Sequence, residues 1–216
     1  MRRRPPDDGV VSVFIADEQA TFPVDAPRWV RLAEAVLDDE GVHGDAELSL
    51  LFVADDVIAG LNHRFMGTEG PTDVLAFPID GELVEPGRTP DGGGPGPDRL
   101  PGDPDDLPLL LGDVVICPAV ANRNASDHAG TYDDELALLI VHGILHLLGR
   151  DHATEDERAA MQARERELLG RHHGELARDP WTAGPTDAGG PTDAGGPTDA
   201  GDPGGPAGSS GAPADA

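Results

Sequence analysis

The chain has 216 residues, 41 of them acidic and 15 basic, and a formal net charge of -26 at pH 7. Nucleic-acid binding normally requires a positive surface, so the total charge argues against a nucleic-acid partner, although many of the acids lie in two low-complexity stretches. The single cysteine, Cys117, excludes an intrachain disulfide and favours a cytoplasmic protein. Its neighbours are apolar, so we expect a buried, unreactive thiol. No apolar run is long enough to span a bilayer.

Glycine, proline and aspartate are concentrated in two stretches that cannot bury enough apolar surface to fold. We therefore predict a flexible N-terminus (1–9), one folded domain (10–170) that contains a mobile Pro/Gly/Asp loop (82–108), and a disordered tail (171–216). The tail repeats Gly-Pro-Thr-Asp-Ala-Gly three times, without apolar residues that could stack. We expect deletion of residues 179–216 to change neither thermal stability nor metal content.

In the first half of the chain, strand-like and helix-like segments alternate. Residues rich in β-branched and aromatic side chains predict the strands, and apolar side chains at helical spacing predict the helices. Asp55 or Asp56 is expected to cap the second helix. The predicted order is a strand (Val10–Ile15), a helix (Arg28–Asp39), a strand (Glu47–Val53), a helix to about Phe65, and a strand (Val74–Ile79).

The second half of the chain predicts one more strand and three helices. Thr154 and Glu157 have the spacing of a capping box that opens the last helix. The segments are a strand (Leu109–Cys117), a helix from Pro118 to about Asp127, a helix from about Asp133 to Leu148, and a polar helix (Glu155–Leu169). Together these elements predict an α+β fold, with a mixed four-stranded sheet, packed helices, and the 133–148 helix lying against the sheet.

The clearest functional signal is a group of three histidines whose spacing allows them to bind one metal ion. His142 and His146 are four residues apart, so both rings lie on one face of the predicted helix. Gly149 can end the helix in a left-handed conformation and return His152 to the same point. Three histidine ligands with one open position are typical of a catalytic zinc site. We therefore predict one zinc ion held by His142, His146 and His152.

The spacing matches the zinc-protease signature H-E-x-x-H-x-x-G-x-x-H except at one position. Residue 143 is glycine, where those proteases carry the glutamate that acts as general base. Ordinary peptide hydrolysis is therefore disfavoured. The remaining histidines considered as ligands are expected to be exposed polar residues: His63, His128, His172 and His173.

Two further blocks carry an aspartate at the start of a predicted strand, Asp73 in Pro71–Phe77 and Asp113 in Leu111–Cys117. Either aspartate alone would be explained by a turn or a cap. Together with the block from Glu135 to His152, followed by Met161 and Glu165, they make the chain closely resemble the YbeY family of bacterial endoribonucleases.

The resemblance implies a single-strand-specific, zinc-dependent endoribonuclease that matures the 3′ end of 16S rRNA and serves ribosome quality control. It also implies ribosomal RNA and the small ribosomal subunit as partners, with no DNA and no membrane. His142, His146 and His152 would hold the zinc. The family's phosphate-binding arginine, counted from Asn62, falls on Met66 here, and Arg64 lies two residues earlier.

Asp73, Asp113 or Asp151 could orient water or hold a ligand imidazole. We expect Asp73 to lie nearest the site and Asp151 to act mainly in a turn, so the predicted catalytic residues are Asp73 and Arg64. Two alternatives remain open. The first is a non-catalytic, zinc-stabilised ribosome assembly factor, which Met66 and the net charge favour. The second, less favoured, is a metal hydrolase that acts on peptides or small molecules.

Overall fold

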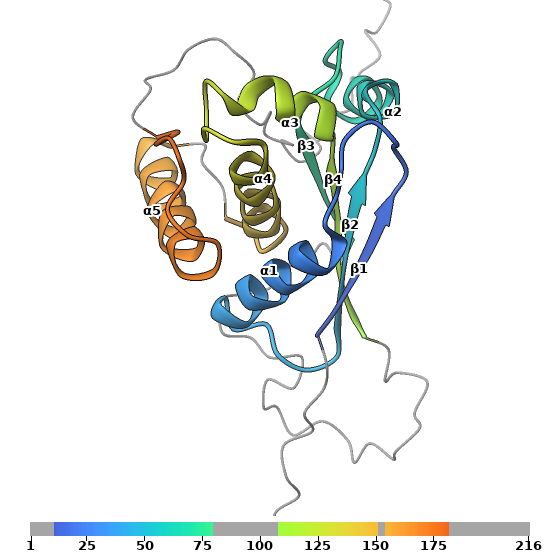
Figure 1. Ribbon diagram of the computed structural model, residues 1–216. Helices are drawn as coiled ribbons and strands as arrows, with labels where there is room; N and C mark the ends of the chain where they lie inside the picture. Colours follow the sequence, from blue (N-terminus) through green and yellow to red (C-terminus); the bar gives the residue numbers. More distant parts are fainter. Residues whose placement is uncertain (1–10, 80–107, 151–153, 182–216) are drawn as a thin grey trace, which may run out of the picture.

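A four-stranded mixed sheet, in the order β1-β2-β4-β3, forms the centre of the computed structural model (Figure 1). The structure describes residues 11–79, 108–150 and 154–181. Strands β1 and β2 are parallel, as are β2 and β4, whereas β3 runs antiparallel to β4 at the edge. The strands are β1 (Val11–Asp17), β2 (Ala46–Phe52), β3 (Val74–Pro78) and β4 (Leu109–Ile116).

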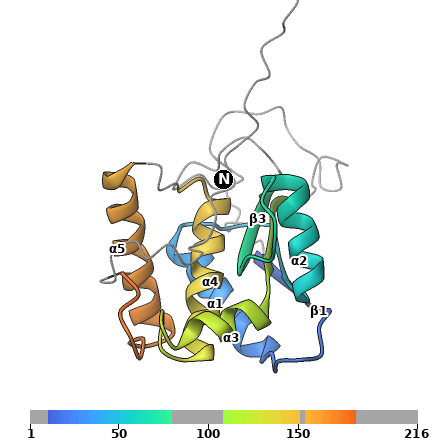
Figure 2. The same ribbon diagram turned by 90° about the horizontal axis from the view of Figure 1, so that it is seen from above.

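The helices cover the two faces of the sheet unequally. Helices α1, α4 and α5 lie on one side, and α2 lies on the other (Figure 1). Seen from above, α5, α4, the sheet and α2 follow one another as layers (Figure 2). The helices are α1 (Ala26–Asp39), α2 (Asp55–Leu61) with its π-helical extension η1 (Asn62–Met66), α3 (Pro118–Ala125), α4 (Tyr132–Leu147) and α5 (Glu155–His172). The predicted α+β fold with a mixed four-stranded sheet is confirmed.

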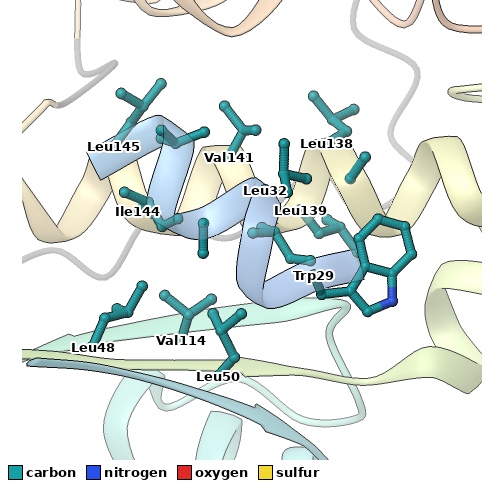
Figure 3. Close-up of a cluster of buried hydrophobic side chains, with 14 of the residues drawn as sticks. Trp29, Leu32, Leu48, Leu50, Val114, Leu138, Leu139, Val141, Ile144 and Leu145 are labelled. Atoms are coloured by element: carbon teal, nitrogen blue, oxygen red, sulfur yellow. The ribbon is translucent and has the colours of Figure 1, made fainter. Parts of the chain in front are cut away.

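Alternation along the strands separates two apolar clusters. On β2, Leu48, Leu50 and Phe52 are buried, whereas the residues between them are only partly covered. The larger cluster joins this face to α1, α4 and α5, and Figure 3 shows strand and helix side chains meeting there. The smaller cluster lies under α2 on the other face and includes Leu75 and Val115. The helix that carries the histidines therefore belongs to the larger core.

Helix α4 is enclosed by the sheet and its neighbouring helices, and 13 of its 16 residues are buried. It lies so close to β4 that a Cβ atom built on Gly143 would be 2.5 Å from Cγ1 of Val114. Position 143 thus faces the sheet. A glutamate here would be placed against the fully buried Val114 of β4, where its carboxylate would have to lose its hydration.

The C-terminal end of α4 and the N-terminal end of α5 both have the predicted capping structures. Gly149 has a φ of 76°, its N–H donates to the carbonyl of His146, and the N–H of Arg150 donates to the carbonyl of Leu145. This is the Schellman arrangement, which ends a helix and turns the chain. The capping box of Thr154 and Glu157 at the start of α5 is also present.

Two predictions on helix ends and tails are wrong. Neither Asp55 nor Asp56 caps α2, because the N-cap is Ala54 and both aspartates lie in the first turn, where they favour the helix dipole. The tail does not begin at residue 171, because α5 continues to His172 and the apolar side chains of Leu176 and Trp181 pack on the core. Deletion from residue 179 therefore removes a packed residue.

The predicted flexible N-terminus (1–9) lies outside the described residues, as do residues 82–107 of the predicted mobile loop and the tail from residue 182. Among the helices that the structure describes, none combines the length and the apolar character needed to cross a membrane.

Candidate metal and nuclease site

His142 and His146 face each other on α4, as the four-residue spacing predicts. Their Nε2 atoms are 3.0 Å apart, and the two rings meet edge to face, with centroids 4.5 Å apart. His142 is 8% exposed and lies on the side of α4 that faces α5. His146 is partly exposed, one turn further along. The pair therefore forms a small polar patch in an otherwise apolar helix.

A buried carboxylate from α5 fixes the orientation of the His142 ring. Oε1 of Glu165 is 2.7 Å from Nδ1 of His142, and Glu165 is 4% exposed. If Nδ1 carries the proton, it donates to the carboxylate, and the lone pair of the ring then lies on Nε2, the atom that faces His146. The other oxygen, Oε2, accepts a hydrogen bond of 2.8 Å from Nε1 of Trp181.

This donor set fits two positions of a zinc site. Tetrahedral zinc with Zn–N bonds of about 2.0–2.1 Å places neighbouring nitrogens about 3.3 Å apart, close to the observed Nε2 separation. The carboxylate behind His142 is the usual second partner of a zinc-bound histidine. The predicted third ligand, His152, lies outside the described residues. Within residues 11–79, 108–150 and 154–181, no three His, Cys, Asp or Glu side chains are grouped to hold a metal ion.

A second polar cluster lies near the start of α4. Nδ1 of His128 is 2.9 Å from Oε1 of Glu135, which is fully buried, and the N–H of Ala129 donates to the same carboxylate. The hydrogen bond to Glu135 raises the pKa of His128, and the charges of Asp73 and Glu165 act in the same direction. The charge of Glu165, the carboxylate that holds His142, therefore also acts on His128.

Asp73, a predicted catalytic residue, lies at the start of β3 and is 2% exposed. Its Oδ1 accepts hydrogen bonds from the N–H of Val74 and from Oγ1 of Thr72, and Nδ2 of Asn124 lies 3.5 Å from its Oδ2. Burial raises the pKa of Asp73, and the charge of Glu135 adds to the effect. A buried carboxyl with a raised pKa is a candidate for an acid–base role.

The other predicted polar residues are placed differently. Val114 faces α4, so its neighbour Asp113 lies on the opposite face of the sheet and cannot serve the histidine pair directly. Arg64 is exposed in η1, with its guanidinium carbon 5.1 Å from the centroid of the Phe65 ring. Met66 packs against the smaller apolar cluster beneath α2. Asp151 lies outside the described residues.

The prediction that the other histidines are exposed is wrong for two of them. The side chain of His173 is 6% exposed, and its Nε2 is 2.8 Å from Oδ1 of Asp134. His128 is partly buried beside Glu135. Each has a local carboxylate partner, which compensates for burial of the ring. His63 is exposed, as predicted.

The sequence interpretation gave no role to Glu165, Glu135 or Trp181. A signal for Glu165 exists in the pattern of α5, because it shares the buried stripe with Met161, Leu168 and Leu169. A carboxylate in such a stripe requires a polar partner. Trp181 follows a stretch of turn-forming residues, and no periodic pattern singles it out.

Comparison with known proteins identifies relatives of the whole domain. The family model described as "Endoribonuclease YbeY" matches residues 14–173. A protein named Endoribonuclease YbeY from Acidothermus cellulolyticus is 46% identical over 159 residues, covering 74% of this chain and 90% of its own. One of the same name from Salinispora tropica is 45% identical, covering 74% of this chain and 94% of its own. A Thermotoga maritima protein solved in solution matches with a TM-score of 0.43 and 24% identity, covering 74% of this chain and 90% of its own.

The family model covers the segment that contains β2, β3, β4 and the paired histidines of α4, and each of the two curated relatives matches 74% of the chain. On that basis this chain belongs to the endoribonuclease YbeY family.

Proposed function

We propose that this protein is a single-strand-specific, zinc-dependent endoribonuclease that matures the 3′ end of 16S rRNA and acts in ribosome quality control in the cytoplasm. The observation that carries the proposal is the pair of Nε2 atoms of His142 and His146, 3.0 Å apart, with Glu165 behind the first ring. Membership of the endoribonuclease YbeY family supports RNA as the substrate. The partners proposed are ribosomal RNA and the small ribosomal subunit.

In this proposal His142, His146 and His152 hold the metal. When bound, zinc supplies a positive charge that polarises a phosphoryl oxygen and lowers the pKa of a coordinated water to about 7. The chain's own residues orient this site. Glu165 holds the ring of His142 in one tautomer through Nδ1. The helix α4 holds both rings at fixed spacing, because nearly all of it is buried.

Asp73 is the proposed acid–base residue, and Arg64 the proposed phosphate-binding residue. Burial raises the pKa of Asp73, and carboxyls whose pKa is shifted by burial recur as acid–base residues in active sites. Asp151 is proposed to act in a turn. If this ranking is correct, Asp73→Asn lowers the rate of RNA cleavage by more than tenfold and Asp151→Asn changes it little. Equal losses in the two variants would contradict it.

The decisive experiment is cleavage of a small-subunit ribosomal RNA precursor by the purified, zinc-loaded protein, with metal content measured on the same sample. His146→Ala removes a proposed ligand. His43→Ala is the matched control, because His43 is exposed and pairs with Asp38, and neither residue belongs to the proposed site. We expect cleavage by the parent and the control, and loss of cleavage and zinc in His146→Ala.

A protein that binds zinc and small ribosomal subunits but does not cleave RNA would contradict the nuclease proposal. It would support a non-catalytic ribosome assembly factor. Peptide hydrolysis without RNA cleavage would instead support a metal hydrolase that acts on peptides or small molecules.

A further inference from the structure

The segment that follows α5, residues 174–181, runs back beside that helix (Figure 1). Its backbone is hydrogen-bonded to the connection between α3 and α4 and to the first turn of α4. The N–H of Arg178 donates to the carbonyl of Ala129, and the N–H of Ala177 donates to Oδ2 of Asp134. The fit is close, because a Cβ atom on Gly130 would lie 2.7 Å from Cβ of Ala177. The segment is thus part of the packed domain.

At the end of this segment, Trp181 begins a chain of hydrogen bonds that leads to the histidine pair. Its Nε1 donates to Oε2 of Glu165 over 2.8 Å, and Oε1 of the same carboxylate is 2.7 Å from Nδ1 of His142. Nε2 of His142 then faces Nε2 of His146. The indole ring is also held from outside, because the guanidinium carbon of Arg166 lies 4.4 Å from its centroid.

The two oxygens of Glu165 therefore have separate partners. An indole N–H can only donate, so Trp181 occupies Oε2 and leaves Oε1 for His142. Without that donor, a buried carboxylate oxygen would lose its hydrogen bond, and the carboxylate would be free to rotate toward water. The ring of His142 would then be held less firmly in the tautomer and orientation that a metal requires.

We propose that Trp181 is a positioning residue for the metal, acting through Glu165 on His142. The inference rests on the proposed function, since it takes zinc to be the group that the histidines hold. It adds a residue from outside the region that the family model matches, which ends at residue 173. The segment 174–181 thereby joins the end of the domain to its reactive centre.

The chain provides a matched control for this proposal. It has two tryptophans. Nε1 of Trp29 is buried and has no hydrogen-bond partner among the residues that the structure describes, whereas Nε1 of Trp181 donates to Glu165. Replacement of either residue by phenylalanine removes an indole N–H and part of a ring. Only Trp181→Phe breaks the connection to His142.

The test is the dissociation constant of Zn²⁺ for the full-length protein, measured by competition with a chromophoric chelator at fixed pH. Loss of a direct partner of a metal ligand weakens binding by about 10- to 100-fold, which is the expectation for Glu165→Gln. Trp181 acts one step further away, so we expect Trp181→Phe to weaken binding by about threefold to tenfold. Trp29→Phe should leave the constant unchanged. The visible spectrum of bound Co²⁺ should change in Trp181→Phe and not in Trp29→Phe.

A second variant carries benzothienylalanine at position 181. This tryptophan analogue has sulfur in place of the indole N–H, so it removes the hydrogen bond and keeps the size of the ring. Weaker zinc binding in this variant supports the proposal even if Trp181→Phe does not fold. Zinc binding as tight as in the parent, in this variant or in folded Trp181→Phe, overturns the role of Trp181 and leaves the proposed function intact. A parent protein that binds no zinc overturns the proposed function, and this inference with it.

Discussion

Substitution of Gly143 by alanine tests the close approach of α4 to the sheet. The added Cβ would lie 2.5 Å from Cγ1 and 3.2 Å from Cγ2 of Val114, well inside the usual carbon–carbon contact distance of about 3.5–4.0 Å. Val114 is fully buried and β-branched, so its side chain has no alternative position of low energy. Either the helix must move away from β4 or the valine must leave its rotamer.

The expected magnitude follows from two opposing effects. Overpacking of a core typically destabilises by about 1–3 kcal/mol. Alanine in a helix interior is more favourable than glycine by up to about 1 kcal/mol. Subtracting the helix gain from the strain leaves about 0–2 kcal/mol. Because the 2.5 Å contact is with a fully buried side chain, we expect Gly143→Ala to lower the free energy of unfolding by an amount in the upper half of this range, about 1–2 kcal/mol. For a domain of this size, that is a decrease in Tm of about 2–8 °C.

The assay is urea and thermal unfolding followed by circular dichroism. Gly60→Ala is the control, because a Cβ atom on this α2 residue meets nothing within 4 Å, and it should be neutral or stabilising. In the double variant Gly143→Ala/Val114→Ala, the clash is removed, so the alanine at 143 should no longer destabilise. A Gly143→Ala protein at least as stable as the parent would refute the argument, and so would an unchanged loss in the double variant.

Three further changes test local contacts. Because the hydrogen bond to Glu135 raises the pKa of His128, the protonated ring stabilises the fold below about pH 6.5, and this contribution is lost as pH rises through the raised pKa. The urea midpoint of His128→Gln should thus fall further below that of the parent at about pH 5.5 than at about pH 9. Burial raises the pKa of Cys117 to about 11, so a thiol reagent at pH near 8 should modify the native protein far more slowly than the urea-unfolded one; equal rates would contradict this. Thr154→Ala removes the capping box of α5 and should destabilise by about 1 kcal/mol, measured by urea unfolding, whereas an unchanged midpoint would show that the cap contributes nothing.

The regular elements could be predicted because their signals are local. The Schellman turn at Gly149 and the capping box at Thr154 depend on residues a few positions apart. The facing rings of His142 and His146 also follow directly from helical spacing. In these places the nearest neighbours in sequence are also the neighbours in space.

The contacts that could not be predicted join distant parts of the chain. Glu165 on α5 contacts His142 on the neighbouring helix α4. Trp181 contacts Glu165 only because the segment after α5 turns back. His173 was expected to be exposed, but it is stacked on Trp29 in α1, with ring centroids 6.4 Å apart. Low apolar content after residue 170 suggested a free tail, yet two apolar side chains pack on the core and hydrogen bonds to distant residues also hold the segment there.

The burial of α4 has a consequence for how the protein takes up and loses a ligand. Backbone hydrogen bonds in an element enclosed on nearly every side open only with the whole domain, so its amide hydrogens should exchange among the slowest in the protein. A ring carried on such an element keeps its place whether or not an ion is bound, unlike the ligands of a zinc finger, which become ordered only with the metal. If the chain binds the proposed zinc, removal of the ion by a chelator should therefore be reversible without refolding, because the helix that carries His142 and His146 persists while the ion is exchanged.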